Sequence, residues 1–383
     1  MEFIKYIIIF ILRYIISSLC IFPIDNRKIV FYPINGNYYC NLKYISEYIE
    51  NNFNEKKIIW FLKDKKVFNN KKFFSYRKNS FSFFYHVMTA RFIIFNDTFP
   101  KYFFKRKKQI YINTWHGGGA YKKIDSVYKN DLKYFRKKRM LEALNKIDYI
   151  IASSEGFKRA FAEDTGIKVS KFLNIGMPRN DIFFSKEKIE NISSKIYDIY
   201  NIDTRKKIVL YAPTFREHNL KDDLNIDRIL ETLNKRFNNQ YIFMLRCHPH
   251  IMNKVLKKNK KSNNIIDVSL YPDMQELLCA TDILITDYSS CMWDFSLMYK
   301  PCFIYANDLE EYKIERNFHT PIKDWPFPLS INNDELIKNI DNFDNDKYIK
   351  KVKEHHEKLG SYENGQASEK ICILINSICS EES

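Results

Sequence analysis

The stretch IYINTWHGGGAYKK, residues 110–123, decides how the rest of the chain is interpreted. A short apolar run typical of a buried strand leads into three consecutive glycines, in a chain that has only nine glycines among 383 residues. Glycine loses more backbone entropy on folding than other residues, so three together require a reason. The pattern predicts a strand ending in a tight loop, where bare N–H groups approach an anion and His116 lies at the loop mouth. The alternative is an ordinary turn with a core histidine.

Apolar strands and helices alternate on both sides of this loop. In the first half, strands are predicted at 28–33, 57–62, 91–96, 109–115, 148–153 and 171–175, and helices at 41–51, with Asn41 as N-cap, and 155–164. In the second half, strands are predicted at 207–211, 241–246, 265–268, 283–286 and 302–305, and helices at 225–237, 274–280 and 290–297. This alternation is typical of parallel sheets with helices on both faces. The sequence therefore predicts an α/β protein with two Rossmann-like, doubly wound domains facing a cleft.

The polar segment 186–204 is interpreted as the link between these domains. The expected parts are a membrane-associating helix at 1–24, an acceptor-side domain at 25–190, a nucleotide-binding domain at 205–340, and helices at 346–383 that pack back across the domains. A basic amphipathic helix is predicted at 131–146. The Asn- and Asp-rich segment 332–346 is expected to be a surface loop.

Residues 3–22 are strongly apolar, but Lys5 and Arg13 interrupt them and Pro23 follows. A central arginine costs about 2.5–3.5 kcal/mol on membrane insertion, while each Ile, Leu or Phe returns about 0.3–0.6 kcal/mol. Three interpretations remain open: a monotopic helix in the membrane interface, a single transmembrane anchor, and a packed first helix. A cleaved signal peptide is not predicted, because Glu2 lies in the n-region and no small-x-small cleavage site follows.

Composition excludes several classes of protein. The formal net charge of +16 permits a polyanionic partner, but no nucleic-acid-binding motif accompanies it. The eight cysteines form no C-x-x-C pair, which favours free thiols in a reducing cytosol over a disulfide framework or a zinc site. No G-x-x-x-x-G-K-[ST], G-x-G-x-x-G or G-x-S-x-G motif is present, so an ordinary NTPase, a dinucleotide oxidoreductase and an α/β-hydrolase are not indicated.

Five clusters of polar or glycine residues each follow a predicted strand, where open α/β sheets bind ligands. They are His116 with Gly117, Gly118, Gly119 and Ala120; Arg179 in GMPRND; Pro213 with Thr214; Arg246 with Cys247 and His248; and Ser289 with Ser290 and Asp294. Arginine suits phosphate oxygens, histidine can protonate a leaving oxygen, and a serine-rich helix start can bind an anion. Taken alone, each cluster is also compatible with an ordinary turn or helix start. His248 and His250 have a zinc-ligand spacing, but no clear third ligand lies nearby.

Taken together and in this order, the motifs resemble those of the CDP-glycerol glycerophosphotransferase family, which includes teichoic-acid primases and polymerases. The resemblance covers nearly the whole chain and rests on NLKY (41–44), TWHG (114–117), GMPRND (176–181), APT (212–214), RCHP (246–249), TDYSS (286–290) and ENGQAS (363–368). It implies a GT-B-like fold and a transferase that moves an alditol phosphate, glycerol phosphate foremost, from a CDP-alditol to a hydroxyl of a lipid-linked or polymeric acceptor. CMP would be released, in teichoic-acid-like or capsular polymer synthesis at the cytoplasmic face of the bacterial plasma membrane.

The resemblance also implies roles for individual residues. His116 corresponds to the catalytic base, and His248 is assigned a second catalytic role. Nucleotide- and pyrophosphate-binding positions correspond to Arg179, Pro213, Thr214, Arg246, Cys247, His248, Ser289, Ser290 and Asp294, and the loop Gly117–Ala120 is expected to line the substrate phosphate. No metal ligands are predicted, and dependence on Mg²⁺ is left open.

One departure from the family pattern concerns the loop itself. Many members have Thr-Pro after the His-Gly pair, where this chain has Gly118-Gly119-Ala120. The identity of the alditol and of the acceptor therefore stays open, as does the choice between a primase and a polymerase. The alternatives are a CDP-ribitol ribitolphosphotransferase, a GT-B glycosyltransferase that uses a nucleotide sugar, and, more distantly, a non-catalytic polyanion-binding protein.

Overall fold

A computed structural model describes residues 2–63, 73–78, 80–100, 102–123, 141–214, 223–247, 264–315 and 317–380. The chain forms two compact units. The first unit consists of Met1–His116, Ile124–Asp181 and Tyr362–Ser383, and the second of Gly117–Lys123 and Ile182–Ser361. The peptide bond between His116 and Gly117 is therefore one of the points at which the chain passes from one unit to the other.

The first unit contains a seven-stranded parallel sheet with the order β3-β2-β1-β4-β5-β6-β7. Its strands are β1 (Asp25–Tyr32), β2 (Lys57–Phe61), β3 (Phe74–Tyr76), β4 (Ala90–Phe95), β5 (Ile110–Asn113), β6 (Tyr149–Ala152) and β7 (Phe172–Asn174). All six residues of the central strand β4 are buried, as expected of a parallel strand covered on both faces.

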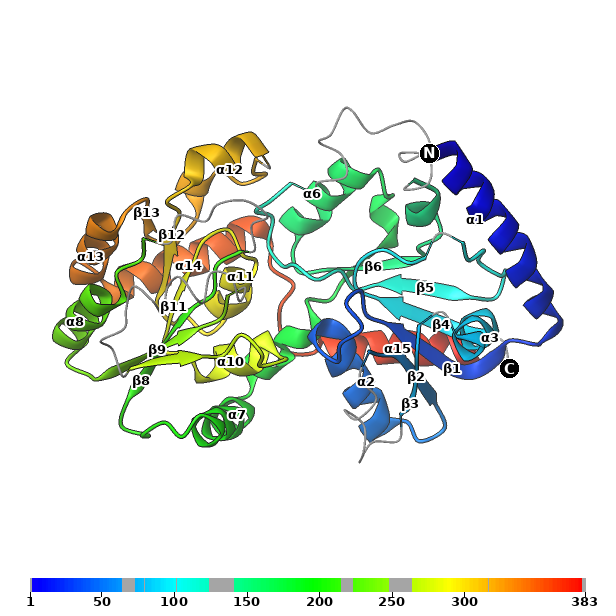
Figure 1. Cartoon of the computed structure of the whole chain (residues 1–383), viewed down its shortest axis with the longest axis horizontal. Coiled ribbons are helices and arrows are strands. Elements are labelled where there is room, and N and C mark those ends of the chain that lie inside the picture. Colours follow the sequence, from blue (N-terminus) through cyan, green and yellow to red (C-terminus); the bar gives the residue numbers. More distant parts are fainter. Residues whose placement is uncertain are drawn as a thin grey trace. The chain divides into compact units, whose positions relative to one another are not determined.

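The helices of the first unit cover its sheet, and α6 (Glu155–Thr165) shows how local residues set the two ends of a helix. They also include α2 (Cys40–Asn52), α3 (Phe81–Thr89) and α15 (Ala367–Ser380). The Ser154 side chain accepts the Phe157 N–H at the start of α6, and Gly166 ends the helix with a left-handed φ of 71°. The C-terminal helix α15 lies beside α2 against the sheet and buries Ile371 and Ile375 in its core (Figure 1).

The second unit contains a six-stranded parallel sheet with the order β10-β9-β8-β11-β12-β13. Its strands are β8 (Lys207–Tyr211), β9 (Tyr241–Leu245), β10 (Ile265–Asp267), β11 (Ile283–Thr286), β12 (Cys302–Tyr305) and β13 (Leu329–Ser330). Its helices are α7 (Lys186–Ile199), α8 (Ile226–Phe237), α10 (Met274–Ala280), α11 (Cys291–Ser296), α12 (Leu309–Glu315), α13 (Asn333–Asp341) and α14 (Asn345–Leu359). The predicted fold class, an α/β protein with two parallel-sheet domains, is confirmed.

Two features of the predicted organisation differ from the structure. The segment 332–346 is not a surface loop, because α13 lies there and buries Leu336 and Ile340. Its Asn332 side chain accepts the Glu335 N–H, so a residue that suggested a loop is an N-cap. The change of unit at Asp181–Ile182 comes before the polar segment 186–204, most of which is α7, packed on α10 (Figure 1).

The N-terminal segment forms α1 (Glu2–Ser17) and the short 3-10 helix η1 (Ser18–Ile21). Across the described part of the chain, no helix is long and apolar enough to cross a membrane. Ile16 is buried in the first unit, and Arg13 forms an ion pair of 3.0 Å with Glu142. Many of the other apolar side chains of α1 are exposed: Ile7, Ile8, Phe10, Ile11, Leu12, Tyr14 and Ile15. The helix is thus anchored to the first unit but keeps an exposed apolar surface.

Two smaller expectations concern side chains and a helix. All eight cysteines are free, which confirms the prediction of unpaired thiols, and six of them are buried. The basic helix predicted at 131–146 lies largely outside the described residues, within which 141–145 are helical.

Candidate active site

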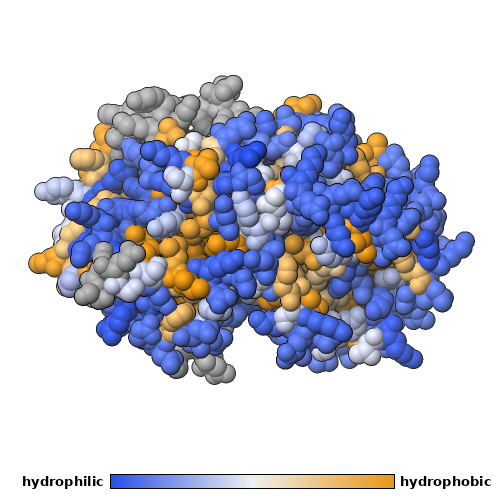
Figure 2. Space-filling view, turned by 180° about the vertical axis from the view of Figure 1, so that it is seen from behind, coloured by the Kyte–Doolittle hydropathy of each residue, from blue (hydrophilic) through white to orange (hydrophobic). Residues whose placement is uncertain are grey.

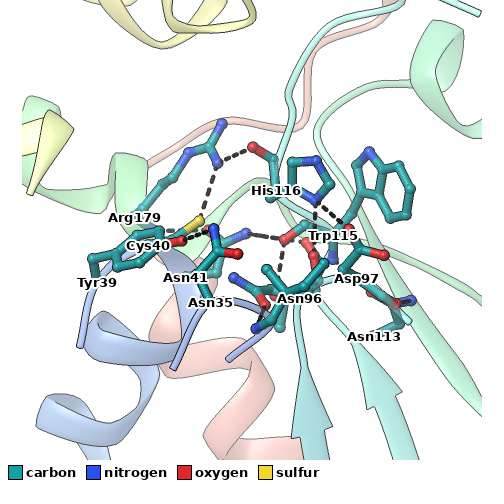
Figure 3. A network of polar contacts seen from close by, with 12 residues as sticks. Asn35, Tyr39, Cys40, Asn41, Asn96, Asp97, Asn113, Trp115, His116 and Arg179 are labelled. Carbon is teal, nitrogen blue, oxygen red and sulfur yellow. Dashed lines mark hydrogen bonds and ion pairs between the residues drawn. The ribbon is translucent and has the colours of Figure 1, made fainter. Parts of the chain in front are cut away.

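His116 lies in the loop after β5, at the carboxyl edge of the first unit's sheet. Its Nδ1 atom is 2.9 Å from the Asn96 carbonyl oxygen and 3.8 Å from Asp97 Oδ2 (Figure 3). The imidazole stacks on Trp115 with a centroid distance of 4.6 Å, and 47% of its side chain is exposed. When the ring is neutral, an Nδ1–H that donates to Asn96 leaves Nε2 with the lone pair. The loop therefore presents a histidine in the tautomer that can accept a proton at Nε2.

The backbone before His116 is held in an unusual conformation. Trp115 has a φ of 51°, in the left-handed region that bulky residues rarely adopt. Its N–H donates to Asn113 Oδ1 over 2.7 Å, and Asn113 Nδ2 donates to the Asp97 carbonyl oxygen over 2.9 Å. Asn113 thus joins the end of β5 to the turn that follows β4, where both acceptors near the imidazole lie.

Arg179, predicted to bind phosphate, is brought next to His116. Its Nη1 donates to the His116 carbonyl oxygen over 2.6 Å and lies 3.3 Å from Cys40 Sγ. The Arg179 N–H donates to Asn41 Oδ1 over 3.2 Å (Figure 3). The side chain is buried. These contacts direct the guanidinium at the backbone of the predicted base, so Arg179 contributes to the shape of the His116 loop.

Hydrogen bonds join the GMPRND motif to the ENGQAS motif. Glu363 accepts the Met177 N–H with Oε2 and the Asn180 amide with Oε1, each over 3.0 Å. The Asp181 carboxylate accepts the N–H groups of Ala367 and Ser368, over 2.9 and 2.8 Å, at the start of α15. The C-terminal motif therefore supports the loop that carries Arg179.

The residues after His116 belong to the second unit. Gly118 and Gly119 are buried, and a Cβ atom on Gly118 would lie 2.4 Å from Trp293 Cδ1. Gly119 has a φ of 69°, and Ala120 accepts hydrogen bonds from Thr320 N and Oγ1 over 3.2 and 2.6 Å. Gly117 is half-buried. The structure thus gives two of the three glycines a reason that the sequence did not suggest. Gly118 leaves space for the Trp293 indole, and Gly119 adopts a left-handed backbone conformation.

Two buried histidines of α14 help to hold this segment. His355 Nε2 lies 3.1 Å from Tyr121 Oη, and the two rings stack with an interplanar angle of 5°. His356 Nε2 lies 2.7 Å from Ser296 Oγ, and its ring packs on Trp293. Burial lowers the pKa of each histidine to about 4, so both are neutral at neutral pH. Burial also raises the pKa of Tyr121 well above its usual value.

Several predicted nucleotide-binding residues lie at the carboxyl edge of the second unit's sheet, after the neighbouring strands β9, β8 and β11. Thr214 is half-buried and donates through N and Oγ1 to Asp287 Oδ1 over 2.8 and 2.6 Å. Arg246 Nη1 donates to the Tyr271 carbonyl oxygen over 2.5 Å, and Cys247 N–H donates to Ser269 Oγ over 3.1 Å. The sheet topology thus places Pro213, Thr214, Arg246 and Cys247 along one edge.

The third cluster at this edge surrounds the start of α11. Ser289 and Ser290 are half-buried, and Ser289 Oγ accepts the Cys291 N–H over 3.4 Å. Asp294 is buried inside the helix, where its Oδ2 accepts a hydrogen bond from Gln275 over 3.0 Å. The two serines therefore remain accessible, whereas the carboxylate of Asp294 is engaged within the protein.

The predicted catalytic residue His248 lies outside the described residues, as does His250. Within the described ranges, no group of three His, Cys, Asp or Glu side chains is placed to hold a metal ion.

Comparison with known proteins identifies the family. The family model for CDP-Glycerol:Poly(glycerophosphate) glycerophosphotransferase matches residues 14–377. The chain belongs to this glycerophosphotransferase family. Among its relatives, a teichoic acid poly(glycerol phosphate) polymerase of Staphylococcus epidermidis is 31% identical over 94% of this chain and 52% of its own length. The chain thus spans about half of that polymerase.

Two further relatives sharpen the comparison. A teichoic acid ribitol-phosphate primase of Bacillus spizizenii is 28% identical over 79% of each chain. A solved structure of the wall teichoic acid polymerase TagF superposes with a TM-score of 0.83, at 27% identity, over 99% of this chain and 96% of that one. Relatives named for glycerol and for ribitol therefore both match this chain.

Sequence reasoning missed several polar residues around His116 in this member of the family. Asn96 and Asp97 directly follow β4, the neighbour of β5 in the sheet, so the strand-end rule applied to the other clusters would have found them. Asn41 was expected to cap α2, but it lies inside the helix, where the N-cap is Tyr39. Its side chain is turned instead to the His116 loop. No sequence signal distinguished these two roles of an asparagine near a helix start.

Proposed function

We propose that this protein transfers glycerol phosphate from CDP-glycerol to a hydroxyl of a polymeric acceptor and releases CMP. Family membership supports the reaction class. The observation that carries the proposal is the setting of His116, whose Nδ1 faces the Asn96 carbonyl oxygen at 2.9 Å while nearly half of its side chain is exposed. This arrangement suits a general base, since the ring orientation is set at Nδ1 and the proton is taken at Nε2.

In the proposed step, the acceptor oxygen attacks the β-phosphorus of CDP-glycerol while His116 Nε2 removes the hydroxyl proton. The bond between the β-phosphorus and the bridging oxygen breaks, and CMP leaves with the electron pair. His116 becomes a cation in this step, and Asp97 Oδ2 lies 3.8 Å from its Nδ1. The Asp97 carboxylate therefore lies close to the positive charge that develops on the base during the step.

The nucleotide and pyrophosphate are proposed to bind residues of the second unit's carboxyl edge, namely Pro213, Thr214, Arg246, Cys247, His248, Ser289 and Ser290. Phosphoryl transfer depends mainly on positioning and on charge neutralisation. Arg246 suits that role, because its guanidinium is oriented by the Tyr271 carbonyl oxygen. Gly117 is proposed to line the substrate phosphate, with Gly118, Gly119 and Ala120 shaping the backbone around it. Arg179 and Asp294 are proposed to support the site through their buried contacts.

The acceptor is proposed to be lipid-linked, with the protein bound peripherally to the anionic cytoplasmic surface of the plasma membrane. The exposed apolar side chains of α1 and the net charge of +16 support this location.

The test is a donor screen with purified protein, in which CMP release is measured with CDP-glycerol, CDP-ribitol and a panel of nucleotide sugars. We expect turnover with CDP-glycerol, and we expect His116→Ala to abolish it while CDP-glycerol binding, measured by calorimetry, persists. Turnover with CDP-ribitol alone would establish the ribitol alternative, which the relative named as a ribitol-phosphate primase favours. Turnover of a nucleotide sugar alone, or salt-sensitive polyanion binding without any turnover, would overturn the proposal.

A further inference from the structure

Asn41 joins three separate segments of the first unit through one buried side chain. Its Nδ2 atom donates to the carbonyl oxygens of Thr114 and Trp115, over 3.0 and 3.2 Å, and its Oδ1 atom accepts the Arg179 N–H over 3.2 Å (Figure 3). The residue has no exposed surface. One amide at the start of α2 therefore binds both the strand end that leads to His116 and the loop that carries Arg179.

The chemistry of these contacts requires an amide. Two carbonyl oxygens face one end of the side chain and need donors, while an N–H faces the other end and needs an acceptor. An aspartate would present an oxygen to both carbonyl oxygens, and an alanine would leave all three buried groups without this partner. Asparagine can therefore donate to the two carbonyl oxygens and accept from the N–H at the same time, whereas aspartate cannot donate to the carbonyl oxygens.

The backbone of Thr114 and Trp115, which Asn41 binds, sets the position of His116. Trp115 adopts a left-handed φ of 51°, with its N–H bound to Asn113 and its carbonyl oxygen bound to Asn41. The next carbonyl oxygen, that of His116, accepts from Arg179 Nη1 over 2.6 Å. Asn41 therefore acts on His116 from two directions, through the Trp115 peptide before it and through the Arg179 segment beside it.

We propose that Asn41 is a positioning residue for His116, an inference that rests on the proposed role of His116 as the base. Asn41 acts through the backbone, by keeping Nδ1 of His116 against the Asn96 carbonyl oxygen and close to Asp97. A misplaced base lowers the rate of the chemical step without weakening donor binding, and a displacement of about 1 Å can cost about 100-fold. Loss of Asn41 is expected to lower kcat and leave KM for CDP-glycerol nearly unchanged.

The test compares Asn41→Asp and Asn41→Ala with Asn52→Asp and Asn52→Ala, which make the same changes at an exposed asparagine in the last turn of α2. We expect the Asn41 variants to lose about 10- to 100-fold in kcat with KM within about twofold, and the Asn52 variants to match the wild type. If Asn41→Asp does not fold, Asn41→Ala carries the test, because alanine is the best helix former.

A second measurement does not depend on activity. In protein with ¹³C-labelled histidine, the His116 resonance is assigned by its loss in His116→Ala and is then followed in each variant. A shift of this resonance in Asn41→Asp, with the other histidines unmoved, supports the proposal. An unchanged His116 resonance, a kcat within twofold of the wild type, or an equal loss of kcat in Asn52→Asp overturns it. Full activity of His116→Ala would instead refute the proposed function and leave the resonance test of Asn41 valid.

Discussion

Gly118 shows that a glycine motif can serve packing as well as ligand binding. The Trp293 indole lies so close to its Cα that a Cβ atom would sit 2.4 Å from Trp293 Cδ1, a distance that real Cβ contacts do not show. Trp293 is fully buried, and it also packs against His356 on α14. The indole is therefore not free to move away, because protein interiors are close-packed.

Gly118→Ala is expected to destabilise the second unit by about 1–3 kcal/mol, the usual cost of overpacking a core. The quantity to measure is the free energy of unfolding of that unit in urea. Gly166→Ala, in the first unit, is the control for a methyl group added where there is space, since nothing lies within 4 Å of a Cβ at Gly166, and it is followed by the unfolding of the first unit. That variant should show only the cost of placing alanine at a left-handed φ of 71°, about 1–2 kcal/mol.

A double-mutant cycle identifies the clash itself. Trp293→Leu removes the atoms that a methyl group on Gly118 would meet, so the two substitutions should be non-additive, with the double variant more stable than the sum of the single effects predicts. Additive effects would show that the indole is not what requires a glycine at position 118.

At the scale of elements, the strands were the most predictable part of the fold. The bounds of β8, β11 and β12 agree with the predicted runs, because buried parallel strands are continuous stretches of apolar and β-branched residues. The sequence prediction lacked β3 and α3, since β3 has only three residues and α3 reads FSFFYHVMT, which is rich in aromatic residues of modest helix propensity. Tertiary packing decides such segments, and a local pattern does not record it.

The part of the candidate site that could be predicted is the part that depends on where strands end. That His116 and Arg179 lie close together could be predicted because each follows a strand, and parallel strands bring their carboxyl ends to one edge. Asn41 was misassigned because asparagine is favoured both as an N-cap and as a buried amide in a network. Its contacts join residues far apart in the sequence, which no spacing rule could reveal.

The pair of buried histidines on α14 predicts a pH dependence of stability. Burial lowers the pKa of His355 and His356 to about 4, from an ordinary value of 6.5. Below pH 6.5 the unfolded chain binds protons that the native state does not. The contribution of the two neutral histidines to the free energy of unfolding is therefore complete above pH 6.5 and is lost as the pH falls toward 4. The expected loss is on the order of 3 kcal/mol for each histidine over that range. Urea unfolding of the second unit between pH 7.5 and 4.5 measures it.

The variant His356→Gln isolates this effect, because glutamine keeps a polar group near Ser296 but does not titrate. The slope of unfolding free energy against pH should be smaller in His356→Gln than in the wild type. Lys351→Gln, an exposed substitution on the same helix, is the control and should keep the wild-type slope. An undiminished slope in His356→Gln would contradict the assignment of the pH dependence to this buried pair.

At the scale of the whole molecule, charge and apolar surface have to be considered together. In Figure 2 most of the visible surface is hydrophilic, with separate hydrophobic patches. A scattered exposed apolar residue is normal in a folded protein, and Leu270, 93% exposed, is an example. On α1, by contrast, several large apolar side chains are exposed on one helix, in a chain with a net charge of +16. This combination supports the proposal that α1 contacts an anionic lipid surface.

The corresponding prediction concerns binding to lipid vesicles. Wild-type protein should co-sediment with vesicles that contain phosphatidylglycerol, and Phe10→Glu combined with Ile15→Glu should weaken this binding by at least about tenfold, since each buried side chain contributes about 1.5–3 kcal/mol. Leu270→Glu makes the same change at an exposed apolar residue of the second unit and should bind like the wild type. Higher salt should weaken the binding of all three proteins, because it screens the attraction of basic residues to anionic lipid. Equal binding by the α1 double variant and the wild type would leave the net charge as the sole source of attraction and would exclude α1 as the membrane contact.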